Sequence, residues 1–563
     1  MPAVSTIPTR AAQRALPLLL AASFGALNTL SFAPVPHGGW LEIGVFIAYF
    51  LLLFRARSAA GAFAAGLAFG CGGFLSGIWW LYISMHFYGG MAPPLAAGAV
   101  LLFSIYLGFY AGLAALLWRL LSRGRRNWPS AVAMASAWAL GEWLRGTVFT
   151  GFPWLASGYA QTDGPLGGYA SLVGVYGIGW VLALLAALLA QVVAGWPSRN
   201  DEPLETVVPA IAASAPVAAP GAAAMPDGGV RTADRHQAAT NALFHFAPRL
   251  LVGFLLIAGG LLASRIAWTV PSRTSVSVRL LQGSVQQDMK FGQAGIDHAL
   301  ALYQALITAT PADLIVTPET AIPVLMQTIP ASFAESVRHF ADTTGSSVLL
   351  GTIGARLTPA GPTDFTNTTL GVTAGQAGVF RYDKHHLVPF GEFVPWGFRW
   401  FVDLMNIPLG DFSRGAPVQP PFEAHGVRFA VDICYEDIFG EEIARTLRGQ
   451  RQTADVLVNS TNLAWFGNTV ALDQHLQIAR MRALETERPV LRATNTGATA
   501  VIDAQGHVRE RLPAFAVGAL TARVSGTSGL TPYVRLGNLS VLLVSCLGLL
   551  WAAVPLAKAR RRT

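Results

Sequence analysis

The longest stretch of this chain without a charged side chain runs from Ser58 to Trp118, over 61 residues. A hydrocarbon core about 30 Å thick is crossed by about 20 apolar helical residues. The stretch is therefore long enough for two crossings, with a turn at Tyr88–Pro94. Backbone groups in lipid must bond to one another, which favours helices for segments of this length. The sequence thus predicts a helical membrane domain.

Six further apolar stretches bring the expected number of crossings to eight: Leu16–Phe32, Ile43–Phe54, Trp128–Leu144, Leu166–Trp196, Leu250–Ser264 and Leu536–Ala557. The first could instead be a signal peptide, because Arg10 and Arg14 precede it. No convincing small-x-small cleavage site follows it, so we interpret it as an uncleaved helix. The composition agrees, since only 12% of the residues are charged, about half the usual share of a soluble protein.

The basic residues indicate which way the helices run. They precede the first crossing and follow the second, fourth, sixth and eighth, whereas the loops near His37, Tyr88 and Phe152 have almost none. By the positive-inside rule the basic side is cytoplasmic, so the segment between the seventh and eighth crossings lies outside the cytoplasm. The net charge of +8 is explained by this topology, and we expect no nucleic-acid partner.

This topology divides the chain into six parts. They are crossings one to six (1–196), a cytoplasmic linker (197–248), the seventh crossing (249–268), an extracytoplasmic domain (272–533), the eighth crossing (536–557) and a basic cytoplasmic tail (558–563). The linker contains the Ala/Pro-rich tract Val207–Met225, which has little to bury, so we expect disorder. A docking segment is the alternative.

From Ser275 the pattern changes to short β-branched runs that alternate with amphipathic stretches. Alternation over about 260 residues predicts one α/β domain with a full core. The expected strands are Val276–Gln282, Leu314–Val316, Ser347–Thr352, Thr366–Val372, Val379–Tyr382, Arg428–Ile433, Val456–Asn459 and Pro489–Ala493.

Three of these strands end next to reactive side chains. Glu319 follows Leu314–Val316, Lys384 and Glu392 follow the Tyr382 strand, and Cys434 follows Ile433. A thiol has a reference pKa near 8.5, so a nucleophilic cysteine needs a neighbouring base or cation. Glu319 can take the proton, Lys384 can stabilise an oxyanion and Glu392 can orient the lysine. Cys434 can then carry an acyl group as a thioester.

Each of these residues also has a structural interpretation. Cys434 could be an inert core thiol, and Cys71 and Cys546 lie inside apolar runs. Glu319 could be a turn residue, and Lys384 could belong to a solvated cluster with the adjacent histidines. Two neighbouring histidines face apart on a strand, so no metal site is expected, and no cofactor is indicated.

In combination, Glu319, Lys384 and Cys434 resemble the Glu-Lys-Cys triad of the nitrilase (carbon-nitrogen hydrolase) superfamily. Longer strings resemble the bacterial apolipoprotein N-acyltransferase family: Lys384-His-His-Leu-Val-Pro-Phe-Gly-Glu392, Ala464-Trp-Phe-Gly467, His475-Leu-Gln-Ile-Ala-Arg-Met-Arg-Ala-Leu-Glu485 and Arg488-Pro-Val-Leu-Arg-Ala-Thr-Asn-Thr-Gly497. The resemblance covers nearly the whole chain. It implies an αββα sandwich carried by a membrane α-helical bundle of about eight helices.

The resemblance also implies the reaction and its participants. An acyl chain moves from a phospholipid to the α-amino group of a diacylglyceryl-modified N-terminal cysteine of an apolipoprotein, the last step of lipoprotein maturation. The implied setting is the bacterial inner membrane, with the catalytic domain in the periplasm. We expect a monomer.

The resemblance further assigns roles to single residues. Glu319 is the general base, Lys384 the oxyanion stabiliser and Cys434 the nucleophile. The other matching positions are the supporting carboxylates Glu392 and Glu436 and the substrate-pocket residues Tyr435, Trp465 and Asn367. One departure is Phe291, which follows Lys290 where the family often has tryptophan. An aromatic face is retained, so the donor preference could change without loss of activity.

Two rival functions stay open from the sequence. A membrane-anchored amidase would hydrolyse a small amide, and a transporter would line a path with intramembrane charges. Glu142, Arg145 and Asp163 lie near the ends of crossings and form no such series. The apolar segment 396–408 favours the acyltransferase, because a lid dipping into the outer leaflet would admit lipid and exclude water. A buried helix is the alternative for this segment.

Overall fold

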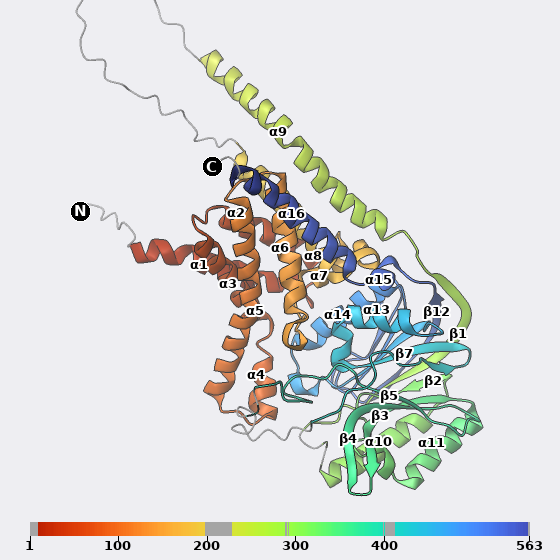
Figure 1. The fold of residues 1–563 in the computed structure, drawn as a ribbon. Coiled ribbons are helices and arrows are strands. Elements are labelled where there is room, and N and C mark those ends of the chain that lie inside the picture. Colours follow the sequence, from red (N-terminus) through yellow and green to blue (C-terminus); the bar gives the residue numbers. More distant parts are fainter. Residues whose placement is uncertain are drawn as a thin grey trace, which may run out of the picture.

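A computed structural model describes residues 10–196, 228–287, 290, 292–397, 399 and 411–560. A helical part that includes the N-terminal third of the chain lies against an α/β part (Figure 1). The long helices of the first part are α1 (Arg10–Asn28), α2 (Gly38–Phe54), α3 (Ala59–Gly77), α5 (Pro93–Ser122), α6 (Trp128–Arg145), α8 (Ala170–Gly195), α9 (Gly228–Ala263) and α16 (Leu539–Arg560). Each corresponds to one of the eight crossings that the sequence predicts.

Four stretches of the described chain are long and apolar enough to cross a membrane: Ala59–Gly77, Pro93–Ser122, Gly167–Gly195 and Phe246–Ala263. Three shorter apolar stretches accompany them: Ala15–Ser31, Gly38–Phe54 and Leu539–Val554.

Helix α6 carries Glu142 and Arg145, which are buried and lie 3.8 Å apart at their closest N and O atoms. Arg145 also donates to the carbonyl oxygens of Phe152 (2.6 Å) and Trp154 (2.8 Å), so its charge holds the loop that follows the helix.

The basic loops of the helical part lie together at one end. Arg119 Nη2 donates to the Arg57 carbonyl oxygen at 3.2 Å, and Arg126 Nη1 donates to that of Ala194 at 2.9 Å. The other ends of these helices face the α/β part. There, Tyr159 donates from its hydroxyl to the Ile438 carbonyl oxygen at 3.0 Å. The basic end and the α/β part are therefore on opposite sides of the bundle.

Helix α9 begins at Gly228, inside the segment 197–248 that the composition predicts to be a disordered linker. The Ala/Pro-rich tract Val207–Met225 itself lies outside the described residues. From Gly228 the chain has no proline until Pro248 and is rich in alanine, the best helix former. Over residues 228–248 the structure thus has a helix where a linker is expected. The same helix contains the seventh expected crossing and ends at Ala263.

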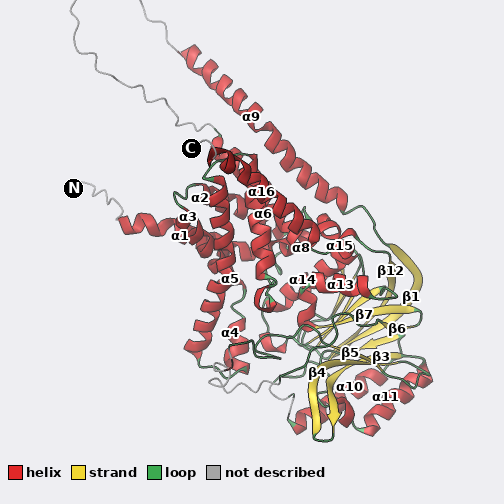
Figure 2. Ribbon diagram, in the orientation of Figure 1, coloured by secondary structure: helices red, strands yellow, loops and turns green. Residues whose placement is uncertain are grey.

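The α/β part contains two six-stranded sheets (Figure 2). The first has the order β12-β1-β2-β3-β4-β5, with β1 (Val270–Gln282), β2 (Leu314–Val316), β3 (Ser347–Thr358), β4 (Gly361–Val372), β5 (Phe380–Asp383) and β12 (Gly518–Ser528). The second has the order β11-β10-β9-β8-β7-β6, with β6 (Phe422–Ala424), β7 (Val427–Ile433), β8 (Val456–Thr461), β9 (Val490–Thr494), β10 (Ala500–Ile502) and β11 (Val508–Arg511). The strands β1, β2 and β3 run parallel to one another, as do β7, β8 and β9.

The two sheets pack face to face. One hydrophobic cluster joins Val278, Leu280 and Val316 of the first sheet to Val431 and Val458 of the second. The outer face of the first sheet is covered by α10 (Gln293–Thr308) and α11 (Ala331–Thr344). The outer face of the second is covered by α13 (Gly440–Gly449) and α14 (Ala471–Thr486). The order of layers is helix, sheet, sheet, helix.

A carboxylate of the α/β part completes a membrane helix. Helix α8 is interrupted at Gly174, whose φ of +66° is costly for any residue with a Cβ. After this interruption the Val175 amide donates outside its own helix, to Glu485 Oε1 of α14 at 2.9 Å. Glu485 is also paired with Arg482 at 3.1 Å. Both charged side chains are fully buried. The two parts of the chain are therefore joined through buried polar contacts as well as apolar packing.

Candidate active site

Glu319, Lys384 and Cys434 each stand just beyond the end of a strand, as the sequence predicts. Glu319 follows β2, Lys384 follows β5 and Cys434 follows β7. Cys434 has a φ of +53°, in the left-handed region that a non-glycine residue rarely adopts. Such a conformation persists only where the surroundings enforce it, and it is common at active sites.

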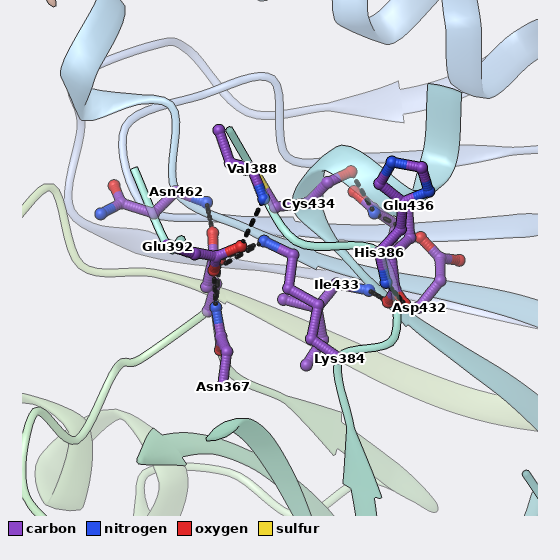
Figure 3. Close-up of polar contacts among 12 residues, drawn as sticks. Asn367, Lys384, His386, Val388, Glu392, Asp432, Ile433, Cys434, Glu436 and Asn462 are labelled. Carbon is purple, nitrogen blue, oxygen red and sulfur yellow. Dashed lines mark hydrogen bonds and ion pairs between the residues drawn. The ribbon is translucent and has the colours of Figure 1, made fainter. Parts of the chain in front are cut away.

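Two carboxylates share one buried ammonium beside the cysteine (Figure 3). Lys384 Nζ lies 2.9 Å from Glu392 Oε1 and 3.3 Å from Glu319 Oε1. Asn367 Nδ2 donates to the same two oxygens, at 2.9 Å and 2.7 Å. The lysine and the amide thus hold both carboxylates in one fixed arrangement.

Glu319 also receives a backbone hydrogen bond from the opposite sheet. Its Oε2 accepts from the Asn462 amide at 2.8 Å, just beyond the end of β8. The Asn462 side chain in turn donates to Gln287 Oε1 at 2.7 Å and accepts from Asn495 Nδ2 at 3.0 Å. Three donors therefore point at the Glu319 carboxylate and fix its orientation.

Glu436 connects the cysteine turn to the lysine segment. Its Oε2 accepts from the Ile433 amide at 2.7 Å and from the Tyr382 hydroxyl at 2.9 Å. Its Oε1 accepts from the amides of His385 at 2.7 Å and His386 at 3.2 Å. This buried carboxylate fixes the segment after Lys384 relative to the residue before Cys434, which is a supporting role.

The electrostatics leave the thiol protonated and the lysine charged. Burial raises the pKa of Cys434 to about 12, with a further increase from the charge of Glu319 and a decrease from Lys384. Burial lowers the pKa of Lys384, but the carboxylates of Glu392 and Glu319 raise it more, so it lies above the ordinary value. The thiol can therefore act as a nucleophile only if a base takes its proton as it attacks.

The structure places the expected substrate-pocket residues in different surroundings. Tyr435 is buried, and its hydroxyl donates to the Gly151 carbonyl oxygen of the helical part at 3.0 Å. Trp465 is 40% exposed, and its carbonyl oxygen accepts from Ser84 Oγ at 2.8 Å. Asn367 contacts the two carboxylates. Phe291 lies outside the described residues.

Sequence reasoning misses Asn462, which contributes a backbone amide that no residue type reveals. It also leaves Lys290 without a role, although this lysine is buried with its Nζ 3.3 Å from the Glu319 carbonyl oxygen. The one sequence signal for Lys290 is its position, eight residues beyond the apolar strand that ends at Gln282. In the described part of the chain, no three His, Cys, Asp or Glu side chains are grouped so that they could hold a metal ion.

The fold and the site define a class: an acyl-transfer enzyme with a nitrilase-like α/β domain and a helical membrane domain. The family model of the apolipoprotein N-acyltransferase N-terminal domain matches residues 24–188, and that of carbon-nitrogen hydrolase matches residues 282–533. The chain belongs to the apolipoprotein N-acyltransferase family.

Relatives along the whole chain carry this assignment. An apolipoprotein N-acyltransferase of Ralstonia nicotianae is 50% identical over 544 residues, which cover 96% of this chain and 93% of the relative. One of Bordetella bronchiseptica is 40% identical over 580 residues, with 97% of each chain covered. Among solved structures, a CN-hydrolase superfamily protein of Xanthomonas campestris is 19% identical with a TM-score of 0.34, covering 45% of this chain and 91% of that one.

Proposed function

We propose that the chain carries out the reaction of its family, the N-acylation of apolipoproteins, through a thioester on Cys434. Glu319 is the general base and Lys384 stabilises the oxyanion. The observation that carries this assignment is the shared contact of Lys384 with Glu319 and Glu392 beside Cys434 (Figure 3). A base, a cation and a buried thiol within one site are the groups that acyl transfer needs.

In the first half-reaction, the Cys434 sulfur attacks the ester carbon of a phospholipid while Glu319 takes the thiol proton. Lys384 and a backbone donor hold the negative oxygen of the tetrahedral intermediate. The C–O bond to the glycerol then breaks, and the proton on Glu319 passes to the departing oxygen. Lysophospholipid leaves, and the acyl chain stays on sulfur.

In the second half-reaction, the α-amino group of the diacylglyceryl-modified cysteine attacks the thioester. Glu319 accepts a proton from the attacking nitrogen, and that proton returns to sulfur as the C–S bond breaks. Water must stay away from the thioester until the amine arrives, because hydrolysis would release a free fatty acid. A site buried between two packed sheets and a membrane domain supports that exclusion.

We propose the following placement in the bacterial inner membrane. Eight helices cross it, with the basic loops and residues 558–563 in the cytoplasm and the catalytic domain 272–533 in the periplasm. The location of the basic loops at the end of the bundle opposite the α/β part supports this orientation. We also propose that the protein acts as a monomer.

Access from the lipid is supported by the segment after Glu392. Trp396 is 99% exposed, and tryptophan is the residue that most favours the membrane interface. Gly397 and Arg399 are also described, whereas residues 398 and 400–408 of the expected lid lie outside the described residues. We propose that the phospholipid donor enters from the outer leaflet beside Trp396.

The test is to trap the acyl-enzyme. The full-length protein is incubated with a phospholipid that carries a labelled acyl chain, without acceptor, and is then digested for mass spectrometry. We expect the label on the peptide that contains Cys434, linked by a bond that hydroxylamine cleaves. A label on Cys71 or Cys546 would contradict the assignment, as would ammonia release from small amides without any lipid-linked intermediate.

Replacing Glu392 by Ala tests the supporting carboxylate. Lys384 then keeps only Glu319 as a partner, so we expect acyl-enzyme formation to slow by about 10-fold to 100-fold. Glu392→Gln keeps an oxygen that can accept from Lys384 or the Val388 amide, and its loss should be smaller. Single-turnover rates measure the effect and thermal unfolding checks the fold. An unchanged rate in Glu392→Ala would show that Glu319 alone positions the lysine.

A further inference from the structure

Lys290 is a second buried cation next to the proposed site. Its side chain is buried, with 5% of the residue exposed. Its Nζ donates to the Glu319 carbonyl oxygen at 3.3 Å. Among the described residues, no carboxylate oxygen lies within the 4.0 Å of an ion pair with Lys290. A buried charge is costly, so the position of Lys290 calls for an explanation.

The loop that carries Lys290 is attached to the site at several points. The amides of Ser284 and Val285 donate to the Asn495 carbonyl and Oδ1 at 2.8 Å and 3.0 Å. Gln287 Oε1 accepts from Asn462 Nδ2 at 2.7 Å. Asn462 is the residue whose amide also holds the Glu319 carboxylate. The lysine is thus held by the same contacts that position the base.

A count of charges gives Lys290 a role. Glu319 and Glu392 contribute two negative charges, and Lys384 contributes one positive charge. When Glu319 takes the thiol proton it becomes neutral, but the tetrahedral intermediate gains one negative charge on oxygen. Glu392 and Lys384 cancel, so the net charge of these three groups and the intermediate stays at −1, while the negative charge moves from the Glu319 carboxylate to the new oxyanion. A cation whose field reaches the oxyanion stabilises the intermediate.

We infer that Lys290 is a charge-balancing residue of the active site, whose ammonium group offsets the anionic charge that remains when Cys434 attacks the phospholipid ester. This inference rests on the proposed function of Cys434. A structural role is the alternative, in which Lys290 only donates to the Glu319 carbonyl oxygen. The two roles differ in their dependence on charge, because a backbone carbonyl accepts from a neutral donor as well.

The charge of Lys290 is lost at moderately alkaline pH. Burial lowers its pKa to about 8, although the charges of Glu319 and Cys434 raise it in part. The ammonium is therefore present below about pH 8 and disappears as the pH rises through that value. Acyl-enzyme formation by the unmodified protein should accordingly decline on the alkaline side, from about pH 8 upward.

The experiment measures single-turnover acylation of the full-length protein from pH 6 to 10, in detergent micelles containing phosphatidylethanolamine with a radiolabelled acyl chain. Lys290→Met should slow acylation by about 10-fold to 100-fold at pH 7 and remove the alkaline decline. Lys290→Arg keeps the charge at all these pH values, so it should retain more activity than Lys290→Met and move the decline upward by at least one pH unit. Arg279→Gln is the matched control, because Arg279 is a buried cation bonded to the carbonyl oxygens of Leu306 and Thr310.

Each outcome decides the question. An upward shift of the decline in Lys290→Arg, absent from Arg279→Gln, supports charge balance. Unchanged pH profiles in both Lys290 variants overturn it, as does a loss in Lys290→Met that is equal at every pH and is not relieved by arginine. If Lys290→Met does not fold, Lys290→Arg decides alone. If the unmodified protein forms no acyl-Cys434, the proposed function itself fails, which is a separate result.

Discussion

Replacing Cys434 by Ala is expected to abolish both half-reactions, with a loss on the order of 10⁴-fold or more. The variant has no sulfur to carry the acyl chain, and the carboxylates and Lys384 cannot form a thioester in its place. Removal of a nucleophile from a site that acts as a unit has effects of this size. The measurement is lysophospholipid release without acceptor, followed by N-acylation of a diacylglyceryl peptide when it is added. Release at the rate of the unmodified protein would assign the nucleophile elsewhere.

The other two cysteines supply the matched control. Cys71 lies in α3 and Cys546 in α16, both in apolar helices away from the α/β part. The double variant Cys71→Ala/Cys546→Ala leaves Cys434 as the sole thiol of the chain and should keep its activity. It also allows the loss in Cys434→Ala to be separated from unfolding, because both proteins can be compared by thermal unfolding. A large loss in the double variant would contradict the assignment.

The parts of the fold that the sequence predicts are those with a strong local signal. Each apolar stretch corresponds to a helix because a span in lipid needs a long uninterrupted run of apolar residues. The strands β2, β7 and β8 are runs of β-branched and aliphatic residues, and the sequence predicts them with small differences at their ends. The sequence does not predict strand β12. Its buried residues include the small Ala522, which makes the alternation of apolar and polar side chains along this strand weak.

The positions of Glu319, Lys384 and Cys434 could be predicted because each lies within three residues of the end of a strand. Their mutual contacts could not, since they depend on how two sheets face each other across the chain. The amide of Asn462, which holds Glu319, is set by the path of the backbone after β8. Lys290 was visible as a residue, but its burial follows from a loop held by Asn462 and Asn495. Long-range packing, rather than local pattern, sets these features.

The cysteine turn is also attached to the membrane domain, which the sequence does not indicate. The residue after Cys434 donates to the Gly151 carbonyl oxygen, and Arg145 holds the carbonyl oxygens of Phe152 and Trp154 in the same loop. Trp154 Nε1 donates to Gln474 Oε1 on α14 at 2.8 Å. The buried Arg145 therefore holds a loop that contacts the turn at Cys434. This structural role explains a buried charge in the helical part without a transport path.

Replacing Glu319 by Gln should lower the acylation rate at pH 7 by about 10⁴-fold or more and change its pH dependence. With a pKa of about 12, the thiolate makes up roughly one part in 10⁵ of Cys434 at pH 7, so the base supplies what ionisation cannot. Without it the rate should rise up to tenfold per pH unit until about pH 8, where Lys290 loses its charge, because only the thiolate reacts. Loss of the Glu319 charge also lowers the thiol pKa, which makes the fall somewhat smaller.

The pH dependence of the acylation rate in Glu319→Gln distinguishes a general base from a carboxylate that only positions its neighbours. Glutamine has nearly the shape of glutamate, but its amide nitrogen cannot accept from Asn367, Lys384 or the Asn462 amide. Glu319→Asp is the matched control, because it keeps a carboxylate at a longer distance and should preserve a flat profile below pH 8 at reduced rate. A pH-independent loss in Glu319→Gln, equal to that of Glu319→Asp, would mean that the carboxylate positions Lys384 and that another group takes the thiol proton.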